Sequence, residues 1–227
     1  MEIRYLAHSA VELIDGETRI LVDPFITGNP KATVSADELE PTHILLTHGH
    51  QDHFGDTVEI AKRTDAPVLA LTEIADELSE AGLETVHDPN LGGTVGFDWG
   101  RVKLVPAWHS SMTPSGTVSP PAGLLIMVGE RLVYHLGDTC LFSDLKLIAE
   151  RAGKIDVALV PIGGHYTMDR QDAVLACEWV GADVVIPIHY DTFPPIETDA
   201  QAFKSDVENA TESKVVVLAP GESHVVR

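Results

Sequence analysis

The stretch ILLTHGHQDH, residues 44–53, joins an apolar run to three histidines and an aspartate within six positions. His48 and His50 lie two positions apart, so at the end of an extended strand both imidazoles leave the same side of the chain and can bind one ion. If the chain then turns into a helix, Asp52 and His53 project in different directions and can reach a second ion. A polar loop rich in histidine is the alternative. The carboxylate among the imidazoles, directly after a buried strand, favours a metal site.

The pattern His-x-His-x-Asp-His after a strand resembles the signature of the metallo-β-lactamase fold superfamily. Members of that superfamily carry, later in the chain, a third histidine, an aspartate in a Gly-Asp turn and a last histidine after a strand. His109, Asp138 and His189 stand at the matching positions here. The flanking sequences are similar to a subgroup of bacterial and archaeal metal-dependent hydrolases whose relatives include L-ascorbate-6-phosphate lactonases; they lie at residues 6–10, 23–30 and 161–168.

This resemblance implies a complete set of ligands for two divalent ions. The first ion would be bound by His48, His50 and His109, the second by Asp52, His53 and His189, and Asp138 would bridge them. Asp52 would also orient a hydroxide and carry a proton to the leaving group. Zinc is favoured by the five imidazoles, and manganese or iron would fit the same nitrogen and oxygen ligands.

The ligand count leaves each ion an open position, which is typical of a catalytic site. Two ions about 3.5–4 Å apart can share a hydroxide and direct it at an electrophilic carbon or phosphorus. We therefore expect a dinuclear hydrolase that acts on a small-molecule ester or lactone. A phosphodiesterase is the alternative enzyme. A non-catalytic metal-binding protein is the alternative from another class, and the presence of all seven ligands argues against it.

Three further residues are candidates for the rim of this site. His8 follows a predicted strand, and His165 follows two glycines that allow close approach to a ligand. Relatives use the loop of His165 to contact substrate or to stabilise an oxyanion, although each histidine can equally be structural. Asp23 ends a strand, where it either accepts a hydrogen bond from a ligand imidazole or starts an Asp-Pro turn. Residues 110–121 lack periodicity and are expected to form a loop over the metals, with a surface turn as the alternative.

Length and composition agree with one domain spanning residues 1–227. The chain is 44% hydrophobic and long enough to bury a sizeable core. The amino end has no charged-then-apolar leader, and no run of eighteen apolar residues occurs, which predicts an unexported, cytoplasmic protein. The two cysteines, Cys140 and Cys177, argue against a disulfide framework.

The charge balance limits the kinds of partner. Thirty-five acidic and fifteen basic side chains give a net charge of −20. Such a surface repels nucleic acid and anionic membranes, so we expect a small-molecule substrate and neither of those partners. A homo-oligomer is left open by the sequence. The acidic surface fits a cytoplasm of high salt and an ordinary acidic protein about equally well.

Hydrophobic periodicity predicts a fold in which strands alternate with helices. Short apolar or alternating runs predict strands at 3–6, 10–13, 19–22, 43–46, 67–70, 102–105, 124–128, 132–135, 157–160, 184–188 and 215–218. Helical spacing predicts helices at 72–82, 141–152, 173–180 and after a capping box at 198–201. This order fits the αββα sandwich of the superfamily, with two mixed sheets. Every ligand candidate then falls at a strand end, so all can meet along one rim.

Overall fold

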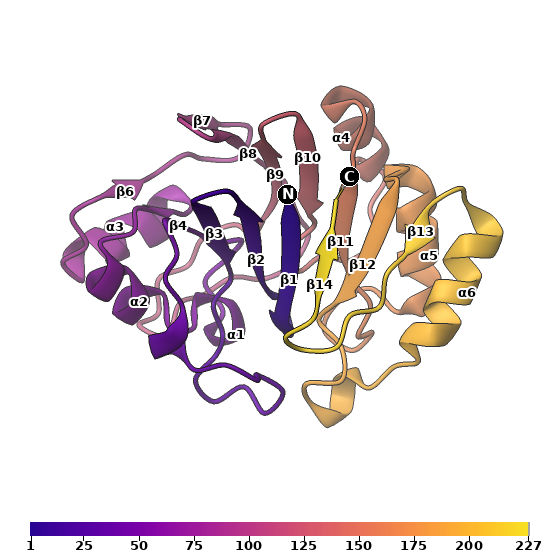
Figure 1. Ribbon diagram of the computed structural model, residues 1–227, viewed down its shortest axis with the longest axis horizontal. Helices are drawn as coiled ribbons and strands as arrows, with labels where there is room; N and C mark the ends of the chain where they lie inside the picture. The colour runs from indigo at the N-terminus through magenta and orange to yellow at the C-terminus, as the bar shows by residue number, and fades with distance from the viewer. Residues whose placement is uncertain (227) are drawn as a thin grey trace.

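Two seven-stranded β-sheets face each other in the computed structural model of the chain, which describes residues 1–226 (Figure 1). The first sheet has the order β14 (Ser223–Val225), β1 (Glu2–Ala7), β2 (Ala10–Asp15), β3 (Thr18–Val22), β4 (His43–Leu45), β5 (Val68–Leu69) and β6 (Val86–His87). The second has the order β13 (Lys214–Val215), β12 (Val184–Ile188), β11 (Val157–Pro161), β10 (Arg131–His135), β9 (Ala122–Val128), β8 (Gly100–Pro106) and β7 (Thr94–Phe97). Each sheet contains antiparallel and parallel pairs, so both are mixed.

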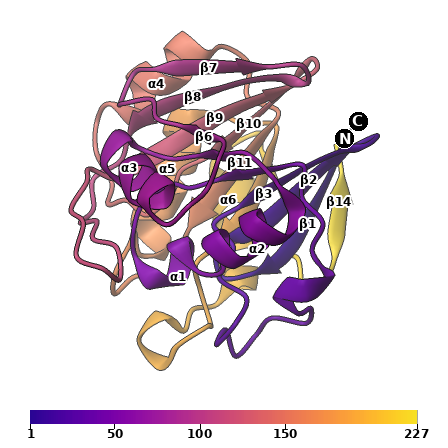
Figure 2. The ribbon, with the colours of Figure 1, turned by 90° about the vertical axis from the view of Figure 1, so that its left-hand side faces the viewer.

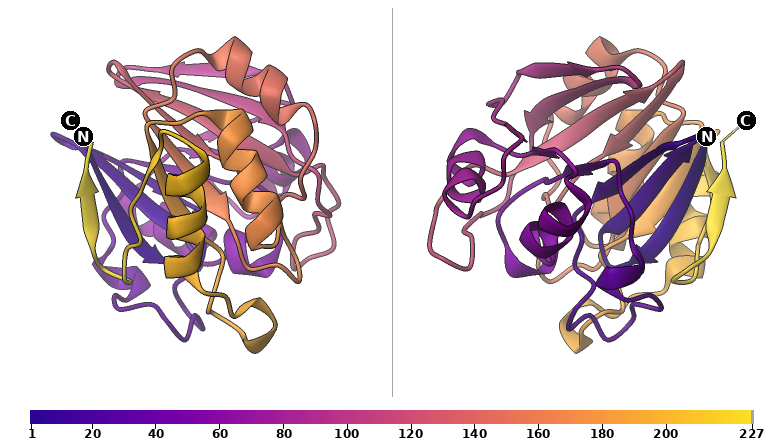
Figure 3. Two further views of the ribbon diagram at one scale, coloured as in Figure 1. Left: turned by 90° about the vertical axis from the view of Figure 1, so that its right-hand side faces the viewer. Right: turned by 60° about the vertical axis from the view of Figure 1, so that its left-hand side comes forward.

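Helices cover the outer faces of the two sheets (Figures 1 and 3). The first sheet is flanked by α1 (Gln51–Phe54), α2 (Thr57–Thr64) and α3 (Thr72–Glu80). The second is flanked by α4 (Leu145–Ala152), α5 (Arg170–Val180) and α6 (Ala200–Ala210). Short 3-10 turns, η1 (Ala36–Glu38) and η2 (Pro194–Ile196), lie in the connections. The αββα sandwich is confirmed. In the part of the chain that the structure describes, no helix has the length and apolar character needed to cross a membrane.

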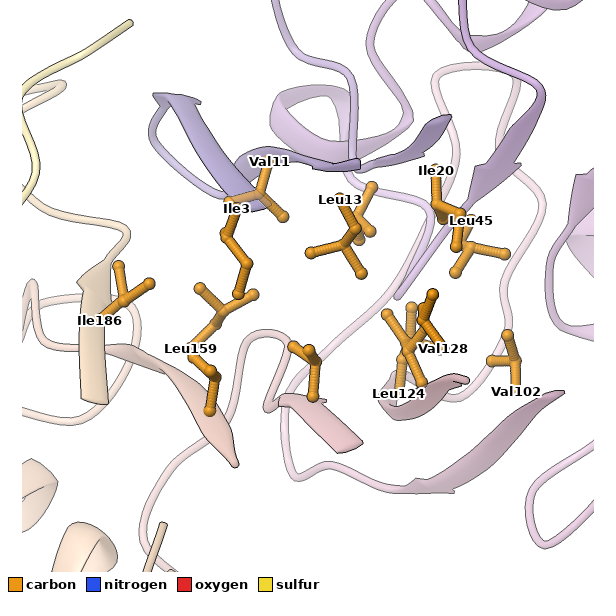
Figure 4. Close-up of a cluster of buried hydrophobic side chains, with 14 of the residues drawn as sticks. Ile3, Val11, Leu13, Ile20, Leu45, Val102, Leu124, Val128, Leu159 and Ile186 are labelled. Carbon is orange, nitrogen blue, oxygen red and sulfur yellow. The ribbon is translucent and has the colours of Figure 1, made fainter. Parts of the chain in front are cut away.

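The side chains of the strands alternate between three apolar clusters. Ile20 and Val22 of β3 point into the space between the sheets, whereas Leu21 belongs to the cluster under α2 and α3. In β9, Leu124 joins the cluster between the sheets and Leu125 packs toward the outer helices. Figure 4 shows the central cluster, in which side chains of the two sheets meet. Because side chains alternate with a period of two along a strand, most of the strands could be predicted from the sequence.

Several boundaries differ from the sequence expectations. Helix α4 begins at Leu145 instead of residue 141. Helix α6 is capped by Asp199, whose carboxylate accepts hydrogen bonds from the first-turn amides, so the capping box expected at Thr198 was wrong. Aspartate is a strong N-cap residue, and its side chain accepts from the amide of Gln201, which Thr198 was expected to bond, and from that of Ala202. The last predicted strand is shorter, at Lys214–Val215. Helix α2 and the edge strands β6, β7 and β14 were not predicted, because short elements give weak periodicity.

The segments that follow β1, β3, β4, β8, β10, β11 and β12 carry the candidate site residues. Three of these residues take an unusual backbone conformation, with φ of 57° at His8, 48° at Asp23 and 55° at His189. Positive φ is uncommon for residues other than glycine and is found preferentially at functional sites, where packing fixes it. The unusual backbone conformation of these three residues therefore helps to set where their side chains lie.

Candidate metal centre

The chain turns from β4 into α1, which was the condition for Asp52 and His53 to project in different directions. His50 is the residue before the helix, and its carbonyl accepts from the amide of His53 at 2.9 Å. Asp52 lies in the first turn, with 30% of its side chain exposed, whereas His53 is fully buried. Gly49 has no space for a side chain, since a Cβ there would lie 2.9 Å from the Thr113 side chain. The turn thus separates His48 and His50 from the pair on the helix.

One carboxylate oxygen lies at the centre of the site. The Oδ2 atom of Asp138 is 3.0 Å from Nε2 of His189 and 3.3 Å from Nε2 of His53. The Nε2 atoms of His109 and His48 lie 3.5 Å and 4.0 Å from the same oxygen. Two ligand atoms on one tetrahedral zinc are about 3.4 Å apart. The spacing therefore fits a set of side chains arranged around metal ions.

Several of these atoms lack hydrogen-bond partners. Nε2 of His53, Nε2 of His189 and Oδ1 of Asp138 are buried and unpaired. The short distance between His189 and Asp138 does not have hydrogen-bond geometry. Buried polar atoms are almost always hydrogen-bonded, so unpaired ones indicate an absent partner. Nitrogen and oxygen ligands of this kind suit divalent zinc, manganese or iron, and the residues present fit such an ion.

The potential ligand atoms form overlapping groups, each with all members within 4.8 Å of one another. His48, His50 and His109 make the first group, which is the trio expected for one ion. The second group contains Asp52, His53 and His189, as expected for the other ion, and adds His8. The third contains His48, His53 and Asp138, so Asp138 adjoins a histidine from each expected trio. The structure thus brings together all seven residues named from the sequence.

Asp23 contacts Nδ1 of His53, the ring nitrogen that does not face Asp138. Its Oδ2 atom lies 2.7 Å from Nδ1 of His53 and accepts from the Thr47 hydroxyl at 2.6 Å. The Thr47 amide donates to Oδ1 at 2.8 Å. The hydrogen bond expected between Asp23 and a ligand imidazole is therefore present. When Nδ1 of His53 donates to Asp23, its Nε2 lone pair is free to face the centre, which is how carboxylates orient metal-bound histidines.

The buried histidines and carboxylates of the site shift one another's pKa values. Burial opposes the cationic form of His53, but Asp138 and Asp23 outweigh it and raise the pKa of His53 well above its usual value. Burial also opposes the charged form of Asp138, yet His189 and His53 hold the pKa of that carboxyl well below its usual value. Burial lowers the pKa of His48. These directions favour a charged Asp138, and because metal ligands bind in their deprotonated forms, a divalent ion would compete with protons at His53.

His8, the extra member of the second group, contacts Asp52. Its ring is fully buried, with Nε2 at 3.1 Å from Oδ2 of Asp52 and Nδ1 at 2.9 Å from the Thr192 hydroxyl. Burial and the neighbouring His189 lower the pKa of His8 to about 4, so the ring is neutral near pH 7. A neutral ring with its proton on Nε2 donates to Asp52 and accepts from Thr192.

Residues 18–190 match the family model described as the Beta-lactamase superfamily domain. The chain belongs to the β-lactamase superfamily. It is 48% identical to a UPF0173 metal-dependent hydrolase of Symbiobacterium thermophilum over the whole length of both chains. It is also 48% identical to a UPF0173 metal-dependent hydrolase of Thermus thermophilus, covering 98% of this chain and 97% of the relative. The relationship to metal-dependent hydrolases is thus confirmed, and the link to lactonases stays a prediction.

A solved structure supports the same placement in the superfamily. Igni18, described as a novel metallo hydrolase from the archaeon Ignicoccus hospitalis, superposes with a TM-score of 0.91 and is 38% identical. The match covers 98% of this chain and 97% of that chain. The shared fold therefore extends over nearly the whole length of both chains.

His165 is not brought into the ligand groups. Its ring is exposed and packs edge-on against Tyr166, with ring centres 4.6 Å apart. Its loop does approach the centre, because a Cβ on Gly163 would lie 2.3 Å from the carbonyl oxygen of His189. The proposed contact of His165 with substrate stays a prediction.

One hydroxyl at the site was missed in the sequence. Thr192 contacts His8 across a separation of 184 residues. Threonine is a common loop residue, so no local pattern marks it as part of a site. Ser111, by contrast, lies in the loop expected over the metals, and its hydroxyl accepts a hydrogen bond from the amide of Gly49 at 3.0 Å.

Proposed function

We propose that this superfamily member is a dinuclear hydrolase that cleaves an ester or lactone of a small molecule. The observation that carries the proposal is the position of Asp138 Oδ2 within 3.0–4.0 Å of four imidazole nitrogens. Two largely separate groups of ligands lie around this carboxylate. An arrangement of this kind favours a bridging role for Asp138 between two ions.

Zinc is the ion we propose, with manganese or iron as alternatives that suit the same ligands. Bound here, two divalent ions would lower the pKa of water, supply hydroxide as nucleophile and polarise the substrate oxygen. The seven side chains would hold the ions through neutral imidazoles and two carboxylates. The chain's other contribution is to orient the ligands and to move the proton.

Asp52 is the residue we propose for proton transfer. Its side chain is 30% exposed, whereas that of Asp138 is 1% exposed, so Asp52 is the carboxylate that a substrate can reach. Burial opposes the charged form of Asp52, and the hydrogen bond from His8 is the largest of the effects that lower its pKa. An ionised Asp52 can accept a proton from the nucleophile and return it to the leaving oxygen.

The charge of the chain supports a neutral substrate. The net charge is −20, and a carboxylate is partly exposed at the centre. An ester or lactone meets little repulsion from this field, whereas an anionic phosphodiester is repelled. The phosphodiesterase therefore stays the second candidate among enzymes.

The test is a substrate screen of protein loaded with zinc or manganese. The panel contains neutral lactones, p-nitrophenyl esters and bis-nitrophenyl phosphate. We expect turnover of esters or lactones, reduced by about 10²–10⁴-fold in Asp52→Asn. Glu150→Gln, which neutralises an exposed carboxylate on α4, is the matched control and should retain activity. Turnover of the phosphodiester alone would promote the phosphodiesterase, and no turnover by metal-loaded protein would favour the non-catalytic alternative.

A further inference from the structure

The loop at residues 110–121 has an apolar outer face and a polar inner face. Met112 and Val118 pair across an antiparallel bridge, which places their side chains on one face of the hairpin. These two side chains are 53% and 69% exposed. Ser111 and Thr113, on the opposite face, are 5% and 2% exposed. This is the reverse of the usual distribution, in which the apolar face is buried.

Hydrogen bonds fix the polar face against the backbone at Gly49 and against α3. Ser110, two residues before Met112, has its hydroxyl 3.4 Å from Nε2 of His50. The Ser111 hydroxyl accepts from the amide of Gly49 at 3.0 Å and lies 2.9 Å from the Ser119 hydroxyl. The Thr113 hydroxyl donates to Glu77 of α3 at 2.6 Å. Figure 2 shows this segment beside α3. Because Gly49 stands between two ligand histidines, the hairpin has a defined position next to the centre.

Trp108 is a third exposed apolar side chain, two residues before this loop. It is 65% exposed and directly precedes the candidate ligand His109. Its amide donates to the hydroxyl of Thr139 at 3.0 Å, and Thr139 directly follows Asp138. The backbone of Trp108 is therefore tied to the turn that carries the central carboxylate.

These three side chains, which we call the apolar rim, stand out from the rest of the surface. In the described part of the chain, six large apolar side chains are exposed, and three of them lie within residues 108–118. Single exposed apolar residues are normal, whereas several in a segment that adjoins a candidate site suggest a surface that binds something. The three side chains carry no charge, so an apolar group is the partner that suits them.

We propose that the apolar rim binds the aliphatic chain of the acyl group in the ester or lactone that the metal centre hydrolyses. The inference rests on the proposed function and names its substrate class. A chain carried by the scissile carbonyl would lie across Met112 and Val118 while the carbonyl lies at the ions. A second copy of the protein is the other candidate to cover the rim, and the net charge of −20 on each copy opposes it.

The test compares p-nitrophenyl hexanoate with p-nitrophenyl acetate. We expect kcat/KM of the native protein to favour the hexanoate by at least about tenfold, since buried methylene groups add binding. The double variant Met112→Ser/Val118→Ser should lower the ratio of the two kcat/KM values by about tenfold. Leu147→Ser on α4 is the matched control, because Leu147 is also an exposed apolar residue, at 56%, and its variant should keep the native ratio. A ratio that is equally unchanged in both variants would overturn the proposal.

Two further measurements separate this inference from the proposed function. Calorimetric titration with hexanoate and acetate measures binding without turnover. If no ester is hydrolysed but hexanoate binds in a manner that depends on Met112 and Val118, the rim is supported and the ester hydrolase is wrong. If both esters are hydrolysed equally well, the proposed function is supported and the proposed role of the apolar rim is wrong.

Gel filtration is the last test of the apolar rim. A dimer that dissociates in the double variant would identify the rim as an interface between copies and overturn the proposal.

Discussion

The buried ring of His8 lies 3.1 Å from Oδ2 of Asp52, although the two residues are 44 positions apart. Asp52 is the only one of the two central carboxylates with appreciable exposure, and His8 holds it from the interior. The second nitrogen of the ring contacts Thr192, so the ring is fixed at both ends. This chain of contacts gives Asp52 one orientation toward the site.

Removal of the Thr192 hydroxyl, which contacts the ring of His8, should slow turnover without loss of bound metal. We expect Thr192→Val to lower kcat by about tenfold, within the 10–100-fold range typical of residues that orient ligands. Thr192→Ser keeps the hydroxyl and should restore most of the rate. Metal content measured in parallel should stay near that of the native protein. A valine variant with unchanged kcat would show that the orientation of His8 is unimportant.

Loss of the carboxylate behind His53 should weaken metal binding. Asp23→Asn removes the charge that contacts Nδ1 of His53 at 2.7 Å. We expect metal affinity to fall about 10–100-fold, measured by competition with a chromophoric chelator. Glu150→Gln serves again as the control for a lost surface carboxylate. Equal affinities for Asp23→Asn and the control would contradict the role assigned to Asp23.

Bound metal should stabilise the fold, because the ligands come from distant parts of the chain. At a metal concentration about 100 times the dissociation constant, the free energy of unfolding rises by about 2.7 kcal/mol. For a chain of this size that corresponds to a Tm about 5–10 °C higher than after chelation. Scanning calorimetry with and without EDTA measures the difference. Asp138→Ala, which lacks the central carboxylate, should show a much smaller response to EDTA.

The two cysteines should differ in reactivity. Burial raises the pKa of the Cys177 thiol to about 12, whereas Cys140 is exposed. Only the thiolate attacks disulfide reagents, and at about pH 8 almost none forms at Cys177. The native protein should therefore release one equivalent of thionitrobenzoate from Ellman's reagent, and the denatured protein two. Cys140→Ser should abolish the native reaction; fast release of two equivalents from the native protein would show that Cys177 is accessible.

The sequence alone predicted those residues of the site that lie close together in one short motif. His48, His50, Asp52 and His53 lie within six positions after an apolar strand, and their placement on either side of a turn follows from that spacing. The later ligand candidates could be named only from the family resemblance. The sheets were predictable for a related reason, since buried strands alternate with a period of two.

Contacts between distant loops were beyond the sequence. The pairing of His8 with Asp52 and Thr192 depends on how β1, α1 and the segment after β12 meet at one edge of the sandwich. For His165, the pattern of glycines indicated a loop that approaches the site, but it could not predict that the ring is exposed and outside the ligand groups. Residue type and spacing predict what a loop can bind, whereas the direction of each side chain is decided by tertiary packing.

Asp138 should lie between two metal ions, and anomalous diffraction from crystals of the metal-loaded protein tests this bridging role most directly. We expect two anomalous peaks about 3.5–4 Å apart, with the Asp138 carboxylate between them. The trio of His48, His50 and His109 should adjoin one peak, and Asp52, His53 and His189 the other. A single peak in metal-saturated crystals, or two peaks without Asp138 between them, would contradict the bridging role of Asp138.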